Sequence, residues 1–289
     1  MNRVPVIACI IIISLLFANS LVAAPVGESA GEIWIDGPAG TQPGSDPNQP
    51  DADVDSTGRS IFVWDGTPAS TRKEIFLRVF PADGSPPGDP VQVNTYTDQA
   101  QHRPRVAINT DGSFLVVWQS DEKPNPEDNF YREVVRSQAF DADANPLGDE
   151  RLLTELQPLI ATGGPYPEVA VLNDASYIVV WRSAQSSDPL ERSTSIQARK
   201  IGANGIPLGG QFQVNETSSQ GEDYAAVTAL DDGGFLVVWT VPKEVRGRRF
   251  AADGTPVGDE FLVNTLLDAS KSQTKVVSHQ DGRILVVWR

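Results

Sequence analysis

The apolar positions of this chain gather in five short runs, and each run ends in tryptophan. The sequence FLVVW stands at 114–118 and again at 235–239, and close variants end at Trp64, Trp181 and Trp288. These runs are apolar at almost every position, so they do not alternate as a half-exposed strand would. Short apolar runs bounded by turn signals are typical of strands that are buried on both faces. Each run is therefore predicted to be a strand packed between two other layers.

A second block of sequence follows each of the first four tryptophans. It reads FPADGSPPGDPVQVN at 80–94, FDADANPLGDERLLT at 140–154, IGANGIPLGGQFQVN at 201–215 and FAADGTPVGDEFLVN at 250–264. The block keeps its length, whereas the step from tryptophan to block varies from 11 residues (Trp239 to Phe250) to 22 residues (Trp118 to Phe140). A long period with one variable segment is typical of a propeller or a solenoid.

Each repeat is expected to form four strands in two hairpins. The segment RVAINTDGSFLVVW places two apolar stretches around an Asp-Gly pair, which supplies the positive φ that a tight turn needs. The constant block forms the second hairpin. An all-β propeller follows, with repeats at about 50–101, 102–162, 163–222 and 223–272 and a partial repeat at 273–289.

The partial fifth repeat raises the question of how the ring closes. GEIWID at 31–36 is similar to the outer-strand pieces GDEFLVN and GGQFQVN. We expect this N-terminal strand to complete the last blade, which gives about five four-stranded blades. Residues 25–50 would then hold this strand and a Pro/Gly-rich linker, and residues 51–289 the propeller. An incomplete chain or an open arc of blades is the alternative.

The pattern V-A-x3-D-G-x-F-x-V-V-W, followed by F-x2-D-G-x-P-x-G-x2-F-x-V-N, resembles a β-propeller-like repeat of large secreted or surface proteins of bacteria. The resemblance covers nearly the whole chain beyond its N-terminal segment. That family is largely uncharacterised, and its shared letters are structural. The resemblance therefore implies a fold and a surface or adhesive setting, but no reaction.

The first 24 residues predict a secretory signal peptide. Arg3 precedes an apolar run from about Val4 to Phe17, and small residues follow up to Ala24. The protein is then expected to be secreted, periplasmic or on the cell surface, with no membrane span once the signal is removed; an uncleaved anchor is the alternative. Cys9 is the only cysteine and lies in this segment, so the mature chain would hold no disulfide and no zinc-thiolate site.

The charge of the chain narrows the classes of partner. The formal net charge is −15, and nucleic acid attracts clusters of Lys and Arg that this chain lacks. Cations, proteins and sugars are better candidates. No cofactor is expected, with calcium as an open alternative at two acidic segments.

The weak calcium candidates lie in DPNQPDADVD and DADANPLGDE. The second begins like a calcium loop, but Pro146 stands where glycine is required and Leu152 stands at the twelfth place. A turn is the favoured interpretation there, and a solvated strand entry is favoured for the first segment. The candidate metal ligands are Asp51, Asp53, Asp55, Asp141, Asp143 and Asn145.

The variable segments after each tryptophan should emerge on one face of the propeller, and variable loops on a rigid scaffold commonly carry function. The longest belong to the second and third repeats. His102 and His279 are interpreted as surface or turn residues, and the N-x-T pattern at Asn215 as part of the repeat. The predicted ligand contacts are Asp121, Glu122, Glu127, Asp128, Phe130, Tyr131, Arg132, Asp188 and Glu191.

Two functions of different classes remain open. The favoured one is a non-catalytic, monomeric module of surface or adhesion type that binds a glycan or a protein through the variable loops. The alternative is a propeller-fold glycoside hydrolase, since such an enzyme needs two carboxyl groups at a suitable separation. An enzyme should carry a polar cluster that breaks the repeat, and the tryptophan strands contain none.

Overall fold

A computed structural model of the chain describes residues 48–67, 72–85, 87–123, 127, 131–155, 164–184, 193–216, 219–267, 269–279 and 281–289. Within these ranges the protein has no helix, and its 19 strands form five antiparallel sheets. No helix in the described ranges is long and apolar enough to cross a membrane. The prediction of an all-β propeller is confirmed.

Each sheet, here called a blade, takes its strands from one run of the chain. Blade 1 holds β1 (Asn48–Val54), β2 (Ser60–Gly66), β3 (Glu74–Phe80) and β4 (Val91–Gln92), and blade 2 holds β5 (Gln101–Ile108), β6 (Phe114–Glu122), β7 (Arg132–Phe140) and β8 (Arg151–Leu152). Blade 3 holds β9 (Glu168–Val171), β10 (Tyr177–Ala184), β11 (Ser193–Ile201) and β12 (Phe212–Gln213), with β13 (Ser219–Gln220) paired to β11. Blade 4 holds β14 (Asp223–Ala229), β15 (Phe235–Val241), β16 (Glu244–Phe250) and β17 (Phe261–Leu262), and blade 5 holds β18 (Lys275–Ser278) and β19 (Ile284–Val287).

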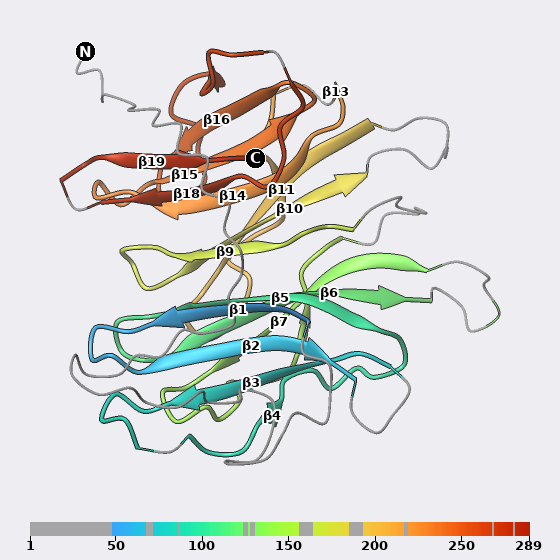
Figure 1. Ribbon diagram of the computed structural model, residues 1–289, viewed down its shortest axis with the longest axis vertical. Coiled ribbons are helices and arrows are strands. Elements are labelled where there is room, and N and C mark those ends of the chain that lie inside the picture. Colours follow the sequence, from blue (N-terminus) through green and yellow to red (C-terminus); the bar gives the residue numbers. More distant parts are fainter. Residues whose placement is uncertain are drawn as a thin grey trace.

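The first strand of each blade packs beside the first strand of the next. These axial strands are β1, β5, β9, β14 and β18, and they make contact in that order. Figure 1 shows the blades following one another along the chain, from the blue strand β1 to the red strands β18 and β19. The blades are therefore arranged around a shared axis, along which the axial strands run.

The tryptophan strands lie second in their blades, and those of blades 1 to 4 are largely buried on both faces, as predicted. The prediction is wrong for β19 of blade 5, where Leu285 is 41% exposed. Trp64, Trp118, Trp181 and Trp239 are each at most 1% exposed. The indole N–H of Trp118 donates to Gln101 Oε1 at 2.8 Å, so its one polar atom is also satisfied. Trp118, Trp181 and Trp239 pack against buried residues of the preceding blade, where a large aromatic side chain buries much surface.

An asparagine at the end of three of the four constant blocks locks the second hairpin to its strand. The side-chain oxygens of Asn94, Asn215 and Asn264 accept the backbone N–H of Ile75, Ile196 and Val245 at 2.8, 2.8 and 2.7 Å. Asn215 is 3% exposed. Its N-x-T pattern therefore belongs to the repeat, because a glycosylation acceptor has to be accessible.

The first acidic segment differs from the expected solvated strand entry. Asp51 Oδ2 accepts the backbone N–H of Val106 at 3.0 Å, and Asp53 Oδ2 accepts that of Ile108 at 2.8 Å. These carboxylates join blade 1 to the axial strand of blade 2. Their alternation in DADVD follows from the period of a strand, which places both on one face.

The remaining acidic candidates close turns. Asp55 Oδ1 accepts the backbone N–H of Thr57 at 2.9 Å. Asp141 Oδ1 accepts the backbone N–H groups of Asp143 and Asn145 at 2.9 and 2.8 Å. This is the turn that the sequence predicted for DADANPLGDE.

Blade 5 contains two strands within the described residues, β18 and β19. The segment GEIWID at 31–36 lies outside the described residues, as does the predicted signal peptide at 1–24. Closure of the ring by an N-terminal strand therefore stays a prediction.

Candidate functional site at the mouth of the propeller axis

The axial strands bring one residue of every repeat to an equivalent place, thirteen positions before its tryptophan. Each faces the valine that precedes the tryptophan in the neighbouring strand. The surrounding letters are shared among the repeats, yet this column varies in charge from one blade to the next. Its members are Asp51, Arg105, Glu168, Ala226 and Lys275.

Three of these side chains form a chain of ion pairs along the axis. Arg105 Nε lies 2.9 Å from Glu168 Oε1, and Lys275 Nζ lies 2.6 Å from the same oxygen. Burial favours the neutral form of Glu168, but Arg105 and Lys275 outweigh it and hold the pKa of Glu168 below its usual value. Burial raises the pKa of Asp51, against the opposing effect of Arg105. We call Asp51, Arg105, Glu168 and Lys275 the axial charge chain.

Two positions earlier, all five repeats hold a residue other than glycine at positive φ. The backbone of the axial strand bulges here, as register shifts in β1, β5 and β14 show. Left-handed backbone costs such residues about 1–2 kcal/mol each, and strain of this kind gathers at functional sites. These residues, called here the mouth ring, are Gln49 (φ 49°), Arg103 (φ 52°), Tyr166 (φ 47°), Tyr224 (φ 45°) and Gln273 (φ 53°).

Three members of the mouth ring contact one another across three blades, with the two tyrosine rings tilted by 43°. The Arg103 guanidinium lies 4.2 Å from the centre of the Tyr166 ring. The rings of Tyr166 and Tyr224 lie 5.2 Å apart, centre to centre. The positions with left-handed backbone thus bring one cationic and two aromatic side chains from three blades together.

Polar side chains from blade 2 continue this surface. Arg103 Nη1 donates to Gln119 Oε1 at 2.7 Å, and Gln119 Nε2 donates to Glu133 Oε1 at 2.9 Å. Gly164 passes close above them, because a Cβ at that position would lie 2.1 Å from Gln119 Oε1. A side chain at position 164 would therefore displace the ends of Gln119 and Arg103.

His102 joins carboxylates of two blades. Its Nε2 lies 3.3 Å from Asp121 Oδ2, and its Nδ1 lies 4.0 Å from Asp65 Oδ2. Lys73 Nζ donates to the same Asp65 oxygen at 2.8 Å. His102 lies in β5 rather than at a turn, and its side chain stays 26% exposed between the two acids. His279 does lie at a turn, where its carbonyl accepts the backbone N–H of Gly282.

Several acids of the mouth have raised pKa values. Burial raises the pKa of Glu133, and Asp121, its cross-strand partner, raises it further. Burial also raises the pKa of Asp223, although Arg182, whose Nε lies 4.0 Å from Asp223 Oδ1, opposes the shift. Perturbed acids that gather in one place mark a candidate functional site.

The mouth also holds buried polar atoms that no described protein group satisfies. Asp65 and Ser120 are 0% exposed, yet Asp65 Oδ1 and Ser120 Oγ have no hydrogen-bond partner in the described part of the chain. An unpaired buried polar group costs about 1–3 kcal/mol, so such groups are rare in native proteins. Four of the five such atoms in the mouth are acceptors: Gln49 Oε1, Asp65 Oδ1, Asp121 Oδ1 and Glu133 Oε2, with Ser120 Oγ as the fifth.

The structure brings few of the sequence-predicted contacts to this site. Asp121 belongs to it. Glu122 instead accepts from Arg136 Nε at 2.7 Å, Arg132 pairs with Glu122 at the end of the β6–β7 ladder, and Tyr131 is exposed beside Lys123. Glu127 is exposed at a turn. Asp128, Phe130, Asp188 and Glu191 lie outside the described residues.

The sequence does carry a signal for the residues that this reasoning missed. The mouth ring stands fifteen residues before each tryptophan and the axial charge chain thirteen before. Aligning the repeats on tryptophan exposes two columns that change from repeat to repeat. The residues that break the repeat lie on the axial strands, which pair with the tryptophan strands.

The described residues hold no group of three or more His, Cys, Asp or Glu side chains placed to bind a metal ion. Calcium therefore stays a prediction, which rests on sequence alone.

No protein-family model and no curated protein sequence matches the chain. Solved structures do match it in shape. A protein of unknown function from Dyadobacter fermentans is 11% identical, with 84% of this chain and 75% of that one aligned at a TM-score of 0.61. An α-L-arabinofuranosidase of Fusarium graminearum is 11% identical, with 81% and 69% aligned at 0.54. A Hadza microbial sialidase is 10% identical, with 84% and 52% aligned at 0.56.

The likeness shows the fold alone. At these identities, side chains of the site cannot be carried from one protein to another, and the chain spans about half the length of the sialidase. What the neighbours share with this chain is the β-propeller architecture.

Proposed function

We propose that the protein is a carbohydrate-binding propeller whose ligand occupies the mouth of the axis. The observation that carries this proposal is the stack of Arg103, Tyr166 and Tyr224 beside unsatisfied buried acceptors. A sugar ring has an apolar face that packs on an aromatic ring and hydroxyl groups that donate hydrogen bonds at its edge. The mouth offers a complement to both.

The polar atoms of the mouth favour an uncharged sugar over an anionic one. The unsatisfied atoms are mainly acceptors, which need donors such as hydroxyl groups. The guanidinium of Arg103 is already bound to Gln119 and stacked on Tyr166. An anionic ligand would have to compete with the side chains of Asp65, Asp121 and Glu133 for Arg103 and the other basic groups of the mouth.

The named neighbours add support of a general kind. Two of the proteins with a similar fold are described as an α-L-arabinofuranosidase and a sialidase, so propellers of this shape are used on carbohydrates. For the setting we propose secretion to the periplasm, the cell surface or the medium, based on the N-terminal segment. Mass spectrometry of the exported protein should find an N-terminus near Pro25.

A glycan array tests the binding proposal. Tyr166→Ala and Tyr224→Ala should each weaken binding at least tenfold, because each removes a ring from the stack. Tyr131→Ala is the matched control, since Tyr131 is exposed on the β6–β7 loop and makes no contact with the mouth ring. If Tyr131→Ala lost binding while both mouth variants kept it, the ligand would bind the variable loop and the proposed site would be wrong.

A glycoside hydrolase is the second candidate, and the Asp121–Glu133 pair favours it. These residues face each other across β6 and β7, and Glu133 has a raised pKa while Asp121 lies beside His102. Glycoside hydrolysis uses two carboxyl groups in different surroundings, one of them with a raised pKa, and Glu133 has such a pKa beside Asp121. Hydrolysis of an array ligand that disappears in both Asp121→Asn and Glu133→Gln, with binding retained, would establish this function in place of simple binding.

A further inference from the structure

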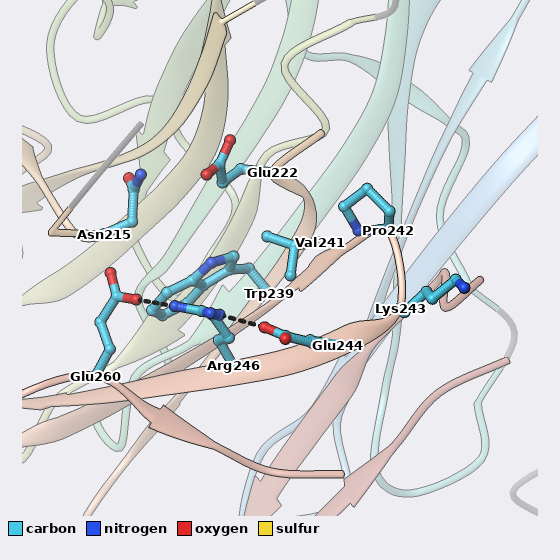
Figure 2. A pocket seen from close by; sticks show the side chains of 9 residues that line it. All are labelled: Asn215, Glu222, Trp239, Val241, Pro242, Lys243, Glu244, Arg246 and Glu260. Carbon is cyan, nitrogen blue, oxygen red and sulfur yellow. Dashed lines mark hydrogen bonds and ion pairs between the residues drawn. The ribbon is translucent and has the colours of Figure 1, made fainter. Parts of the chain in front are cut away.

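A cavity is lined by residues of blade 4 and of the loop that leads into it. It has a volume of about 370 Å³, and Figure 2 shows the side chains around it. Trp239 forms its floor behind Arg246, and Glu222 stands above them. Its polar lining residues include Asn215, Glu222, Lys243, Arg246 and Glu260.

Two carboxylates hold the guanidinium of Arg246 in this cavity. Arg246 Nε donates to Glu244 Oε2 at 2.7 Å, and Nη1 donates to Glu260 Oε2 at 3.0 Å (Figure 2). A planar group bound at both ends in this way has a fixed orientation. The side chain remains 39% exposed, so a face of the guanidinium is open to a ligand.

Blade 2 contains the same arrangement, but its arginine is covered. Arg136 stands opposite Trp118 as Arg246 stands opposite Trp239. Arg136 Nη1 lies 2.9 Å from Glu150 Oε1, and its Nε donates to Glu122 at 2.7 Å. The ring of Tyr96 lies 4.6 Å from this guanidinium, and Arg136 is only 16% exposed.

The loops that approach the two arginines correspond residue by residue. Seven positions separate Asn94 from Gln101, and seven separate Asn215 from Glu222. In the first loop the backbone N–H of Thr95 donates to Glu150 Oε2. In the second the backbone N–H of Glu216 donates to Glu260 Oε1.

The two loops differ at the next position. Tyr96 of the first corresponds in sequence to Thr217 of the second, a residue that lies outside the described part of the chain. Threonine has no ring to place over an arginine. Among the described residues, Trp239 is the aromatic side chain that lines this cavity, and Arg246 lines it as well.

We propose that this cavity is a second binding site, which takes a phenol ring from outside against Arg246. The molecule supplies the precedent, because Tyr96 binds Arg136 in this manner within blade 2. A guanidinium attracts the face of an aromatic ring. The buried carboxylate of Glu222 lines the cavity and can accept from a hydroxyl at the ring edge. A tyrosine side chain of a partner protein and a free phenol both carry this chemistry.

Titration with N-acetyl-tyrosinamide, followed through the Nε–H signal of Arg246 in NMR spectra, tests the proposal. The wild-type protein should show saturable shifts of that signal. Thr217→Tyr should weaken binding at least tenfold, because the chain then supplies its own ring. Leu266→Tyr is the matched control, since Leu266 holds the corresponding place in the following loop, and it should bind as wild type does. An unshifted signal in the wild type, or equal affinity in Thr217→Tyr, would overturn the proposal.

Tyr96→Ala provides an independent test by opening the site in blade 2. The number of bound N-acetyl-tyrosinamide molecules should rise from one to two per chain, with new shifts at the Nε–H of Arg136. A count that stays at one in folded Tyr96→Ala protein would contradict the proposal. Parallel titrations with p-cresol and with a short tyrosine-containing peptide distinguish the two sources of the ring, since a partner's tyrosine requires tighter binding of the peptide.

Discussion

Lys275 Nζ lies 2.6 Å from Glu168 Oε1, so a residue of the last hairpin is bound to blade 3 across 107 positions of the chain. Blade 4 stands between them in sequence, and its residue in the same column is Ala226. The short alanine side chain leaves room at the axis for the lysine to reach blade 3. The axial charge chain thereby holds blade 5, which has two strands in the described residues, against the rest of the propeller.

Glu168→Gln should lower the free energy of unfolding by about 1.5–3 kcal/mol at pH 7, the usual contribution of hydrogen bonds to a charged group. The pKa of Glu168 is held below its usual value, so its stabilising effect is present above the unfolded-state pKa and is lost as the pH falls through the folded-state pKa. Urea unfolding at a series of pH values measures this. The wild type and the variant should converge in acid.

Ala226→Lys provides a contrast in the same column. It adds a third cation to the axis beside Arg105 and Lys275, where the only described carboxylates of the column are Asp51 and Glu168. We expect a loss of stability.

A stability of Glu168→Gln equal to that of the wild type at pH 7 would show that the axial charge chain contributes nothing to holding the blades together.

Glu133→Gln should have the opposite effect on stability. Burial and Asp121 raise the pKa of Glu133, so at neutral pH the folded protein carries a carboxylate in an unfavourable place. This cost is absent below the unfolded-state pKa and grows as the pH rises through the folded-state pKa. Glutamine removes the charge and keeps the oxygen that accepts from Gln119.

The variant should therefore melt at a higher temperature than the wild type at pH 7, and at the same temperature below about pH 4, near the ordinary pKa of glutamate. Differential scanning calorimetry at both pH values checks this. A variant that is less stable at pH 7 would mean that the carboxylate is structural. A substitution that raises stability and weakens ligand binding is typical of a functional residue, and we expect both effects for Glu133→Gln.

The repeat architecture could be predicted because it depends on patterns that every blade shares. The apolar runs ending in Trp118 and Trp239, and the Asp-Gly pair at Asp111–Gly112, report strand burial and a turn with Gly112 at φ +85°. Each is decided by neighbouring residues in the chain. Five copies of the apolar run and three of this Asp-Gly pair make the inference stronger than any single copy would.

The candidate site could not be predicted in the same way, because it depends on contacts between blades. Arg103 and Tyr166 are 63 positions apart, and only the shared axis brings them together. The length and charge of the variable loops predicted a ligand-binding surface there. Glu122, one of the predicted contacts at the edge of such a loop, instead accepts a hydrogen bond from Arg136. Charge in a loop does not show whether a side chain meets a ligand or a neighbouring residue.

Trp118→Ala should destabilise the protein by about 3–5 kcal/mol, because it leaves a cavity between two sheets in a site that is 0% exposed. Trp118→Phe retains an aromatic ring but leaves Gln101 Oε1 without the indole N–H that binds it at 2.8 Å. It should cost less than the alanine variant. Chemical denaturation of the two variants separates the effect of packing from that of the hydrogen bond.

A matched substitution at Trp288 serves as the control for the tryptophan series. Trp288 is partly buried, against the full burial of Trp118, so Trp288→Ala should cost less than Trp118→Ala. Equal losses at the two positions would contradict the assignment of Trp118 to a strand buried on both faces.

Thr154→Asn should stabilise the protein by about 1 kcal/mol, the usual net value of one hydrogen bond. The second repeat ends its constant block with threonine where the others have asparagine, and Thr154 Oγ1 is buried without a partner among the described residues. In blades 1, 3 and 4 the asparagine oxygen accepts a backbone N–H, that of Ile75, for example, at 2.8 Å. The same contact is available from Val135 in blade 2, because Leu153 N–H donates to its carbonyl just as Val93 N–H donates to that of Ile75.

The converse variant, Asn264→Thr, should lose about as much as Thr154→Asn gains. Thermal melts of the two variants and of the double variant test the exchange, and a Thr154→Asn protein no more stable than the wild type would mean that blade 2 satisfies its backbone by another route.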